Sequence, residues 1–529
     1  MTYNDYVYFL MFLPVSLIVY QLLNQKIRYI SLLIFSLAFI SLFGTSSIIF
    51  PFVIATIIYI TSHMLERQKS LCKVALKQAD GEQKKRIKSR FTKKKRIILA
   101  FGIVLTLSML IILKYFDFFA KAINHIRGAA YTGEKISMLH LITPIGISFY
   151  TLQAIGYMAD VYWDKTSAEK NYFKLLLFLC FFPTVMEGPI CSYANIKSKL
   201  FSGEPLKSDN LANGSIRIVW GLFKKIVVAD RLYVIVTALF DSGQSYSGAY
   251  IIIAAISYTI QLYMEFSGCM DIVIGSGWLF GIKLPENFRQ PFLSKNASEF
   301  WRRWHITLGV WLKTYIFYPV SMSAPVKKWN QFGKEKLNKH VTMIVMSALA
   351  LFPVWICNGL WHGAGWNYIF YGMYYFVIIM LELILEPVGK NITDTFKISE
   401  NNKLISFFKT FKTWIIIFIG ELFFRANSLA QGFDMFFAMF RDFHLSTFTD
   451  GSIFSLGLSR ADFLVAVFGA IIVFAVGIIR ERHENILEII SGKRLYIRWT
   501  IYISLILAVI IFGAYGAGYM EVDFIYANF

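Results

Sequence analysis

Charged side chains are scarce in this 529-residue sequence. Asp, Glu, Lys and Arg make up 16% of the residues, while hydrophobic residues make up 56% and the mean hydropathy is +0.54. A soluble globular protein carries about 25% charged residues. The scarcity of charge excludes a disordered chain, argues against a nucleic-acid-binding protein, and predicts an integral membrane protein.

Cysteine is also scarce, with five residues and no CxxC pair. The sequence therefore indicates neither a zinc site nor a disulfide framework, and we expect no bound metal. Four motifs are missing as well: a P-loop, a GxGxxG after a strand, an HExxH and a GxSxG. Their absence disfavours an ATP-driven pump, a dinucleotide-dependent enzyme and a metalloprotease.

Long apolar runs, in contrast, are abundant. A run of roughly 17–25 apolar residues crosses a bilayer as a helix, and the runs here predict an all-α polytopic membrane protein with about eleven to fourteen transmembrane, tilted or re-entrant helices. No internal repeat or linker separates domains, so we expect one membrane domain over residues 1–529. The runs are 6–23, 29–43, 47–64, 97–115, 137–159, 171–186, 212–239, 247–281, 305–320, 341–358, 364–386, 410–424, 462–479 and 499–519.

The positive charge is unevenly distributed. Residues 66–96 contain 13 Lys or Arg against three Asp or Glu, a net charge of +10 out of +20 for the chain. Cytoplasmic loops carry such an excess, so we expect a cytoplasmic basic loop at 66–96. Three apolar runs precede this loop, so we expect the N-terminus on the outer face. Residues 480–498 are also basic, which predicts that the tail 520–529 lies outside.

Polar side chains within apolar segments are costly in a membrane and mark candidate sites. In the segment 355–366, Asn358 and His362 lie four residues apart among aromatic, aliphatic and glycine residues. This spacing places them on one face of a helix. Gly363 and Gly365 would allow that helix to end beside the imidazole. A neutral histidine, with a pKa of about 6.5, suits a general base. A core histidine bonded to a carbonyl is the alternative that the residues leave open.

The segment 299–315 forms a second candidate. Read as one helix, it carries an apolar stripe with the basic side chains off it, which predicts an amphipathic helix at the membrane interface. The adjacent Arg302 and Arg303 would suit lipid head groups or the phosphates of a ligand. The residues alone favour a structural role for His305. The stripe contains Trp301, Trp304, His305, Leu308, Trp311, Leu312 and Tyr315.

Carboxylates inside apolar runs form a third group. Glu265 and Asp271 are six residues apart, so they lie on different helix faces and predict hydrogen bonds between helices instead of a glycosidase-type pair. Glu421 and Arg425 are four apart in the favourable order, which predicts an ion pair within one helix.

Several of these segments together resemble the membrane-bound O-acyltransferase (MBOAT) family, and within it the bacterial branch of alginate O-acetylation subunits and D-alanyl-teichoic acid transferases. The resemblance covers about residues 140–430. After Tyr318, Pro-Val-Ser-Met-Ser-Ala-Pro-Val-Lys-Lys replaces a Gly-Gly-Asn-Arg-like turn, which leaves the polysaccharide open. The segments that carry the resemblance are 285–291, 299–305 and 360–363, with 144–153, 181–183, 188–190, 266–268 and Asp271 in support.

The resemblance implies a bowl of tilted and horizontal helices around a thinned centre. His362 would be the catalytic histidine, Asn358 a polar neighbour that helps position it, and His305 the second histidine of the motif. Arg302, Arg303 and Trp304 would shape the entrance for the acyl donor. The implied donor is acetyl-CoA on the cytoplasmic side, as a substrate and not as a bound cofactor.

The last six residues, Phe524 to Phe529, resemble the Phe-x-Tyr-x-x-Phe tail of such transferases or of a small companion subunit. Tyr526 would then be the first acyl acceptor. A phenol, with a pKa of about 10, loses its proton more easily than a serine hydroxyl does. An aromatic anchor at the membrane interface is the alternative for this tail.

We therefore expect an O-acetyltransferase of the bacterial plasma or inner membrane, in contact with membrane lipid and without a nucleic-acid partner. The sequence has no evident extracellular domain to bind a polymer, so an SGNH-hydrolase-like partner would place the acetyl group on the polysaccharide. One alternative is a D-alanyl transferase that uses a carrier-protein thioester. The other is a transporter of lipid-linked glycans, although the repeated halves typical of transporters are not evident.

Overall fold

The computed structural model describes residues 2–128, 135–397, 402–483 and 486–515, except Asn4, together with Ser399, Tyr519 and Val522. Across these residues every regular element is helical and no strand occurs. Seven helical segments are long and apolar enough to cross a membrane, which confirms the predicted all-α polytopic membrane protein. They are Thr45–Lys77, Gly81–Arg127, Ala249–Leu279, Lys339–His362, Trp366–Thr395, Arg460–Arg482 and Leu495–Phe512.

Several other apolar runs form short or interrupted helices. The run 171–186 is divided into α7 (Tyr172–Cys180) and α8 (Phe182–Val185). The run 137–159 becomes helical only at Ile147, the start of α6 (Ile147–Tyr162). Gly146 precedes α6 with a φ of +74°, where a side chain would collide with the backbone carbonyl of Val185. Hydropathy alone does not reveal such breaks, because Phe, Val and Ile are equally apolar on either side of them.

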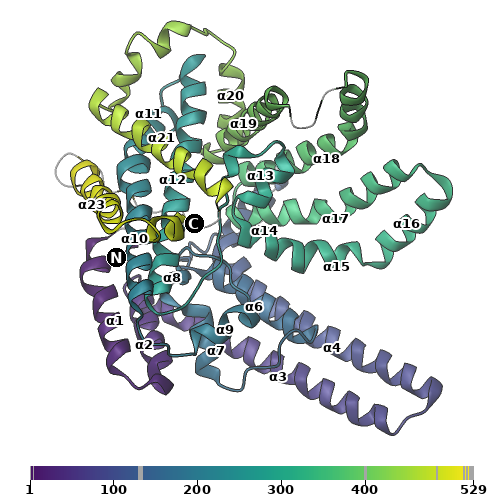
Figure 1. Cartoon of the computed structure of the whole chain (residues 1–529). Coiled ribbons are helices and arrows are strands. Elements are labelled where there is room, and N and C mark those ends of the chain that lie inside the picture. The colour runs from purple at the N-terminus through teal and green to yellow at the C-terminus, as the bar shows by residue number, and fades with distance from the viewer. Residues whose placement is uncertain are drawn as a thin grey trace. The chain divides into compact units, whose positions relative to one another are not determined.

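The contacts within the described chain divide it into two compact units. The first comprises residues 1–215 and 273–285. In it, the antiparallel helices α3 (Ile49–Lys77) and α4 (Gly81–Leu110) lie side by side, and both contact α6 (Figure 1). The other helices of this unit are α1 (Leu13–Leu22), α2 (Arg28–Ser41), α5 (Phe116–Arg127) and α9 (Tyr193–Leu200).

Residues 66–96, predicted as a loop, are helical except for a short turn around Asp80. They form the end of α3 and the beginning of α4. The segment lacks proline and is rich in Lys, Arg, Gln and Glu, which are good helix formers. Its cationic side chains are mostly exposed, so the charge is displayed along a helical hairpin.

The second unit comprises the described residues within 216–272 and 286–522 and holds the candidate site. The boundary between the units falls within α10 (Ser208–Leu222) and α12 (Ala249–Leu279). The remaining helices are α11 (Asp230–Phe240), α13 (Ala297–Arg303), α14 (Ile306–Leu312), α15 (Tyr318–Ser321), α16 (Ala324–Lys336), α17 (Lys339–His362), α18 (Trp366–Thr395), α19 (Lys403–Arg425), α20 (Leu429–Ala438), α21 (Arg460–Arg482), α22 (Ile486–Ser491) and α23 (Leu495–Phe512) (Figure 1).

Helices α17 and α18 pack closely along one another, and both are long and apolar enough to cross a membrane. Gly359 of α17 faces the backbone of Tyr368, and Gly372 of α18 faces the backbone of Trp355. A side chain at either glycine would push the helices apart. Small residues allow membrane helices to approach in this way, so this crossing fixes the end of α17 against α18.

A π-helical turn, Phe223–Ala229, joins α10 to α11 and directs two consecutive lysines to different acidic partners. Lys224 Nζ lies 2.6 Å from Asp271 Oδ2, whereas Lys225 Nζ lies 2.8 Å from Asp230 Oδ1 and 3.5 Å from Glu265 Oε1. The four side chains that make the Lys224 cluster are Arg217, Lys224, Asp271 and Glu286. Because buried charges are stable only when paired, this cluster ties α10 and the π turn to α12.

Candidate active site

Trp361 brings the two candidate histidines into one aromatic cluster. The centroid of its ring lies 5.2 Å from that of His305 and 4.9 Å from that of His362. Both imidazoles are buried, with exposed fractions of 1% for His305 and 3% for His362. Residues 57 positions apart in the sequence therefore contact a single indole. The sequence predicted both histidines as candidates, and the structure adds Trp361 as a ring that both contact.

The segment around His362 has the predicted local structure. Asn358 and His362 both lie on α17, the helix ends at His362, and Gly363 continues as extended chain. Asn358 is buried, and among the described residues no hydrogen-bond partner lies at its amide nitrogen. The ring of His362 meets Phe424 and Tyr371 edge to face, with centroid distances of 5.0 and 5.8 Å. Aromatic rings thus restrict the imidazole, and the amide one turn earlier has a hydrogen to donate.

His305 departs from the predicted single helix over residues 299–315. Helix α13 ends at Arg303 and α14 begins at Ile306, with His305 between them in a left-handed conformation (φ +46°). The prediction of one continuous helix is therefore wrong. Left-handed backbone is unfavourable for a residue with a Cβ and persists where surrounding contacts hold it. The break turns the imidazole inward, where its Nδ1 lies 3.3 Å from Asn287 Oδ1.

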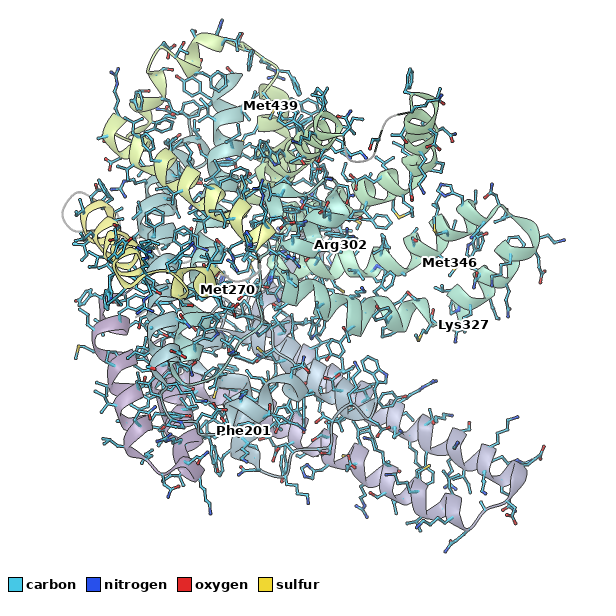
Figure 2. The ribbon with its side chains drawn as sticks, in the orientation of Figure 1. Phe201, Met270, Arg302, Lys327, Met346 and Met439 are labelled. Atoms are coloured by element: carbon cyan, nitrogen blue, oxygen red, sulfur yellow. The ribbon has the colours of Figure 1, made fainter. Side chains whose placement is uncertain are left out.

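The three residues proposed for the donor entrance have different surroundings. Arg302, labelled in Figure 2, is exposed. Arg303 donates two hydrogen bonds to Glu481, each 2.9 Å long, and also pairs with Glu299 at 2.8 Å. Trp304 is buried. Arg303 therefore joins α13 to α21, and Arg302 is the cation of the pair that faces outward.

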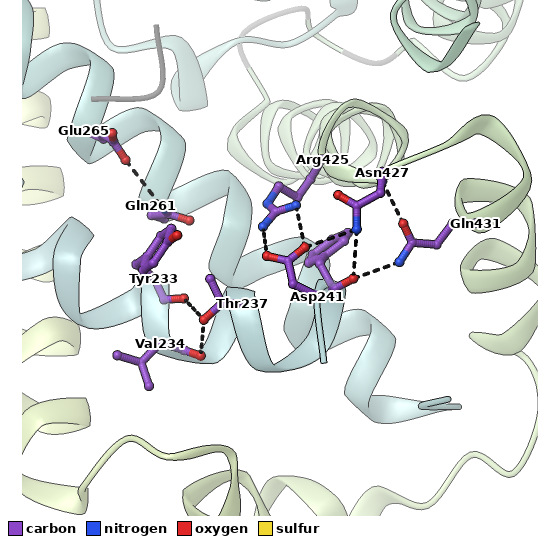
Figure 3. Close-up of polar contacts among 10 residues, drawn as sticks. Tyr233, Val234, Thr237, Asp241, Gln261, Glu265, Arg425, Asn427 and Gln431 are labelled. Atoms are coloured by element: carbon purple, nitrogen blue, oxygen red, sulfur yellow. Dashed lines mark hydrogen bonds and ion pairs between the residues drawn. The ribbon is translucent and has the colours of Figure 1, made fainter. Parts of the chain in front are cut away.

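The predicted ion pair between Glu421 and Arg425 is not formed. Arg425 instead pairs with Asp241 at the end of α11, where its Nη1 lies 3.1 Å from Oδ1. Figure 3 shows Arg425 and Asn427 converging on Asp241. Glu421 is buried and accepts a 2.9 Å hydrogen bond from the hydroxyl of Tyr371. Spacing within one helix did not indicate either partner, because both come from other helices.

The hydrogen bond between Glu421 and the Tyr371 hydroxyl leads to a prediction about stability. Glu421→Gln keeps an oxygen that accepts from Tyr371, so we expect a change in unfolding free energy below about 1 kcal/mol. Glu421→Leu leaves the buried Tyr371 hydroxyl without this acceptor and should cost about 1–3 kcal/mol. Reversible unfolding in mixed detergent micelles, followed by tryptophan fluorescence, measures both. An equal loss in the two variants would contradict the hydrogen-bond role.

Glu265 and Asp271 hold helices together as predicted, although by ion pairs more than by neutral hydrogen bonds. Their partners, Lys224, Lys225 and Arg217, escaped the sequence reasoning. These three cations lie in the apolar run 212–239, and their burial in a membrane segment is itself a signal that could have found them. Among the described residues, no group of three or more His, Cys, Asp or Glu could hold a metal ion. Tyr526, the predicted acyl acceptor, lies outside the described residues.

Comparisons with known proteins agree with this architecture. A family model described as MBOAT, membrane-bound O-acyltransferase family, matches residues 167–426. The chain is 31% identical over 377 residues to a protein of Azotobacter vinelandii named "Probable alginate O-acetylase AlgI", covering 70% of this chain and 69% of that protein. It is 32% identical to the peptidoglycan O-acetyltransferase of Helicobacter pylori, over 63% of each chain. It is 28% identical to the teichoic acid D-alanyltransferase of Bacillus subtilis, over 47% of this chain and 62% of that one.

Proposed function

Because this chain belongs to the membrane-bound O-acyltransferase family and is an acyltransferase, we propose that it transfers acetyl from cytoplasmic acetyl-CoA, by way of Tyr526, towards a cell-surface polysaccharide. The observation that carries the proposal is the contact of two buried histidines with the same ring, that of Trp361. Buried neutral imidazoles in an aromatic, water-poor site suit proton transfer during acyl transfer.

In the proposed step, His362 is the general base. It takes the proton from the phenol of Tyr526 while the phenolic oxygen forms a bond to the acetyl carbonyl carbon. The carbon–sulfur bond then breaks, and the proton on His362 passes to the departing thiolate of coenzyme A. The buried amide of Asn358 lies one turn earlier on the same helix, and it would help to position His362.

The donor entrance is assigned to α13. Arg302 is exposed and would pair with the phosphates of coenzyme A, since a guanidinium binds phosphate through two parallel hydrogen bonds. Arg303, already paired with Glu481 and Glu299, would keep α13 in place. Trp304 would lie beside the part of the acyl donor that carries the thioester.

The acceptor side is assigned to the outer face of a bacterial plasma or inner membrane, with both termini outside. An acetyl group on Tyr526 would there be taken over by an SGNH-hydrolase-like partner, which would place it on sugar hydroxyls. The similarity to enzymes named for alginate and peptidoglycan O-acetylation supports a polysaccharide as the final acceptor.

Labelled acetyl-CoA tests the acyl relay, that is, the transfer of the acetyl group to Tyr526 before it reaches the polysaccharide. We expect purified full-length protein in detergent to gain one acetyl group per chain by intact mass, and Tyr526→Phe to carry about 100-fold less label or none, because the accepting oxygen is gone. Tyr515→Phe is the matched control, as another tyrosine near the C-terminus, and should be labelled like the wild type.

Two outcomes would contradict the relay. Label on Tyr526→Phe equal to that on the wild type would move the acceptor elsewhere. Release of coenzyme A thiol by a wild type that never carries label would leave the acyltransferase intact and remove the tyrosine intermediate.

A D-alanyl transferase is the second candidate, favoured by the similarity to a teichoic acid D-alanyltransferase and by the basic ends of α3 and α4. Its donor would be a carrier-protein thioester docked by an acidic surface. Binding of such a carrier should weaken steeply between low and physiological salt. Thiol release from acetyl-CoA by the purified protein would instead favour the acetyl system.

A further inference from the structure

Asn287 is a buried residue of the 285–291 segment that the proposed reaction does not use. Its exposed fraction is 0%, and its side-chain oxygen is the meeting point of three donors around the break between α13 and α14. The backbone N–H and the hydroxyl of Thr307 donate to Oδ1 at 3.0 and 2.9 Å, and His305 Nδ1 lies 3.3 Å away. The backbone carbonyl of Asn287 also accepts from Ile306 N at 3.0 Å. One residue therefore holds the turn on which His305 sits.

These contacts determine the protonation of His305. The backbone nitrogen of Thr307 is a donor only, so the amide atom facing it is the oxygen of Asn287 and not the nitrogen. An amide oxygen only accepts, so Nδ1 of His305 must carry a hydrogen. In a neutral imidazole the second nitrogen then has a lone pair and no hydrogen.

The surroundings keep this imidazole neutral. Its ring meets Phe266 and Trp361 edge to face, at centroid distances of 4.9 and 5.2 Å. None of the side chains named around it, Asn287 and Thr307 included, carries a charge. Burial lowers the pKa of His305 to about 3. Among the described residues, no hydrogen-bond partner lies at Nε2, so a buried acceptor is left for a ligand.

We propose that Asn287 is a positioning residue that fixes His305 in the Nδ1–H tautomer, so that its Nε2 lone pair accepts a hydrogen bond from the reacting ligand. This inference rests on the proposed function for the identity of the ligand, which is an acyl donor or an acyl acceptor carrying an O–H or N–H group. A hydrogen bond to the other ring nitrogen fixes the tautomer of catalytic and metal-binding histidines in the same manner.

Three variants test the proposal in the acetyl-CoA reaction. Asn287→Leu removes the acceptor and should lower the turnover by about 10–100-fold. Thr307→Val removes one donor to the same oxygen but leaves the contact to His305, so it should lose less activity than Asn287→Leu. A fall in kcat alone would show that the hydrogen bond to His305 forms in the transition state, and a rise in KM alone would show that it forms already in the bound acyl donor.

Asn287→Asp keeps the acceptor oxygen and adds a negative charge beside Nδ1, which favours the imidazolium and raises the pKa of His305. The neutral form is the active one, so activity should be retained at high pH and should fall on acidification at a higher pH than in the wild type. An activity of Asn287→Asp as low as that of Asn287→Leu at every pH would overturn the proposal, because the acceptor oxygen would then not be the property that matters.

The tautomer can also be observed without any activity. With histidine labelled by ¹⁵N, the imidazole nitrogens of His305, assigned by loss of their signals in His305→Gln, should show a protonated Nδ1 and an unprotonated Nε2. A protonated Nε2 in the wild type would disprove the proposal that Asn287 fixes the Nδ1–H tautomer of His305. If the spectrum is as expected but the protein does not act on acetyl-CoA, the proposed donor fails while the positioning role stands.

Discussion

Replacement of His362 by alanine is expected to lower the rate of acetyl transfer by about 10²–10⁴-fold, the usual contribution of a general base. The imidazole ends α17, is 3% exposed, and is held among aromatic rings. Alanine at this position removes the group that is proposed to take the proton from the attacking oxygen. The rate of thiol release from acetyl-CoA, measured with purified protein in detergent, gives the effect on kcat and KM separately.

A matched control separates loss of the base from loss of structure. His444 is exposed and lies in the same unit, so His444→Ala should retain full activity. His362→Gln preserves much of the side-chain volume without the basicity, and should be as inactive as His362→Ala while unfolding at nearly the wild-type temperature. Transfer at the wild-type rate by either His362 variant would refute the assignment of the general base.

The features that the sequence predicted are those set by local rules. The spacing of Asn358 and His362 on one helix, and the helix end at Gly363, follow from helical periodicity and glycine geometry within a few residues. The length and polarity of the apolar runs likewise predicted the membrane helices. Nothing outside these segments was needed to anticipate them.

The features that sequence reasoning missed are set by residues far along the chain. The break at His305 is held by Asn287, 18 positions earlier, and no pattern inside residues 299–315 contains that contact. Glu421 has a favourable partner four residues away in sequence, yet its carboxylate accepts from Tyr371 on a neighbouring helix. An ion pair between residues four apart on one helix stabilises it by only about 0.2–0.5 kcal/mol, which tertiary contacts readily exceed.

Replacement of Asp271 by asparagine is expected to destabilise the fold by about 3–5 kcal/mol, the cost of leaving buried charge without its counter-ion. Asp271 lies 2.6 Å from Lys224 and 3.0 Å from Arg217, and all three side chains are under 10% exposed. The fourth member of the cluster, Glu286, is 46% exposed and partly hydrated. The buried part of the cluster therefore holds two cations and one anion.

Because the buried part of the cluster has more cations than anions, removing a cation and removing the anion should have unequal effects on stability. Lys224→Met removes one of the two buried cations and leaves Arg217 paired with Asp271, so it should cost less than half as much as Asp271→Asn. The double variant should recover part of the loss, because the unpaired ammonium is then absent. Reversible unfolding in mixed micelles measures the cycle. An equal loss for both single variants would mean that shape, and not charge balance, sets the cost at this crossing of α12 and the π turn.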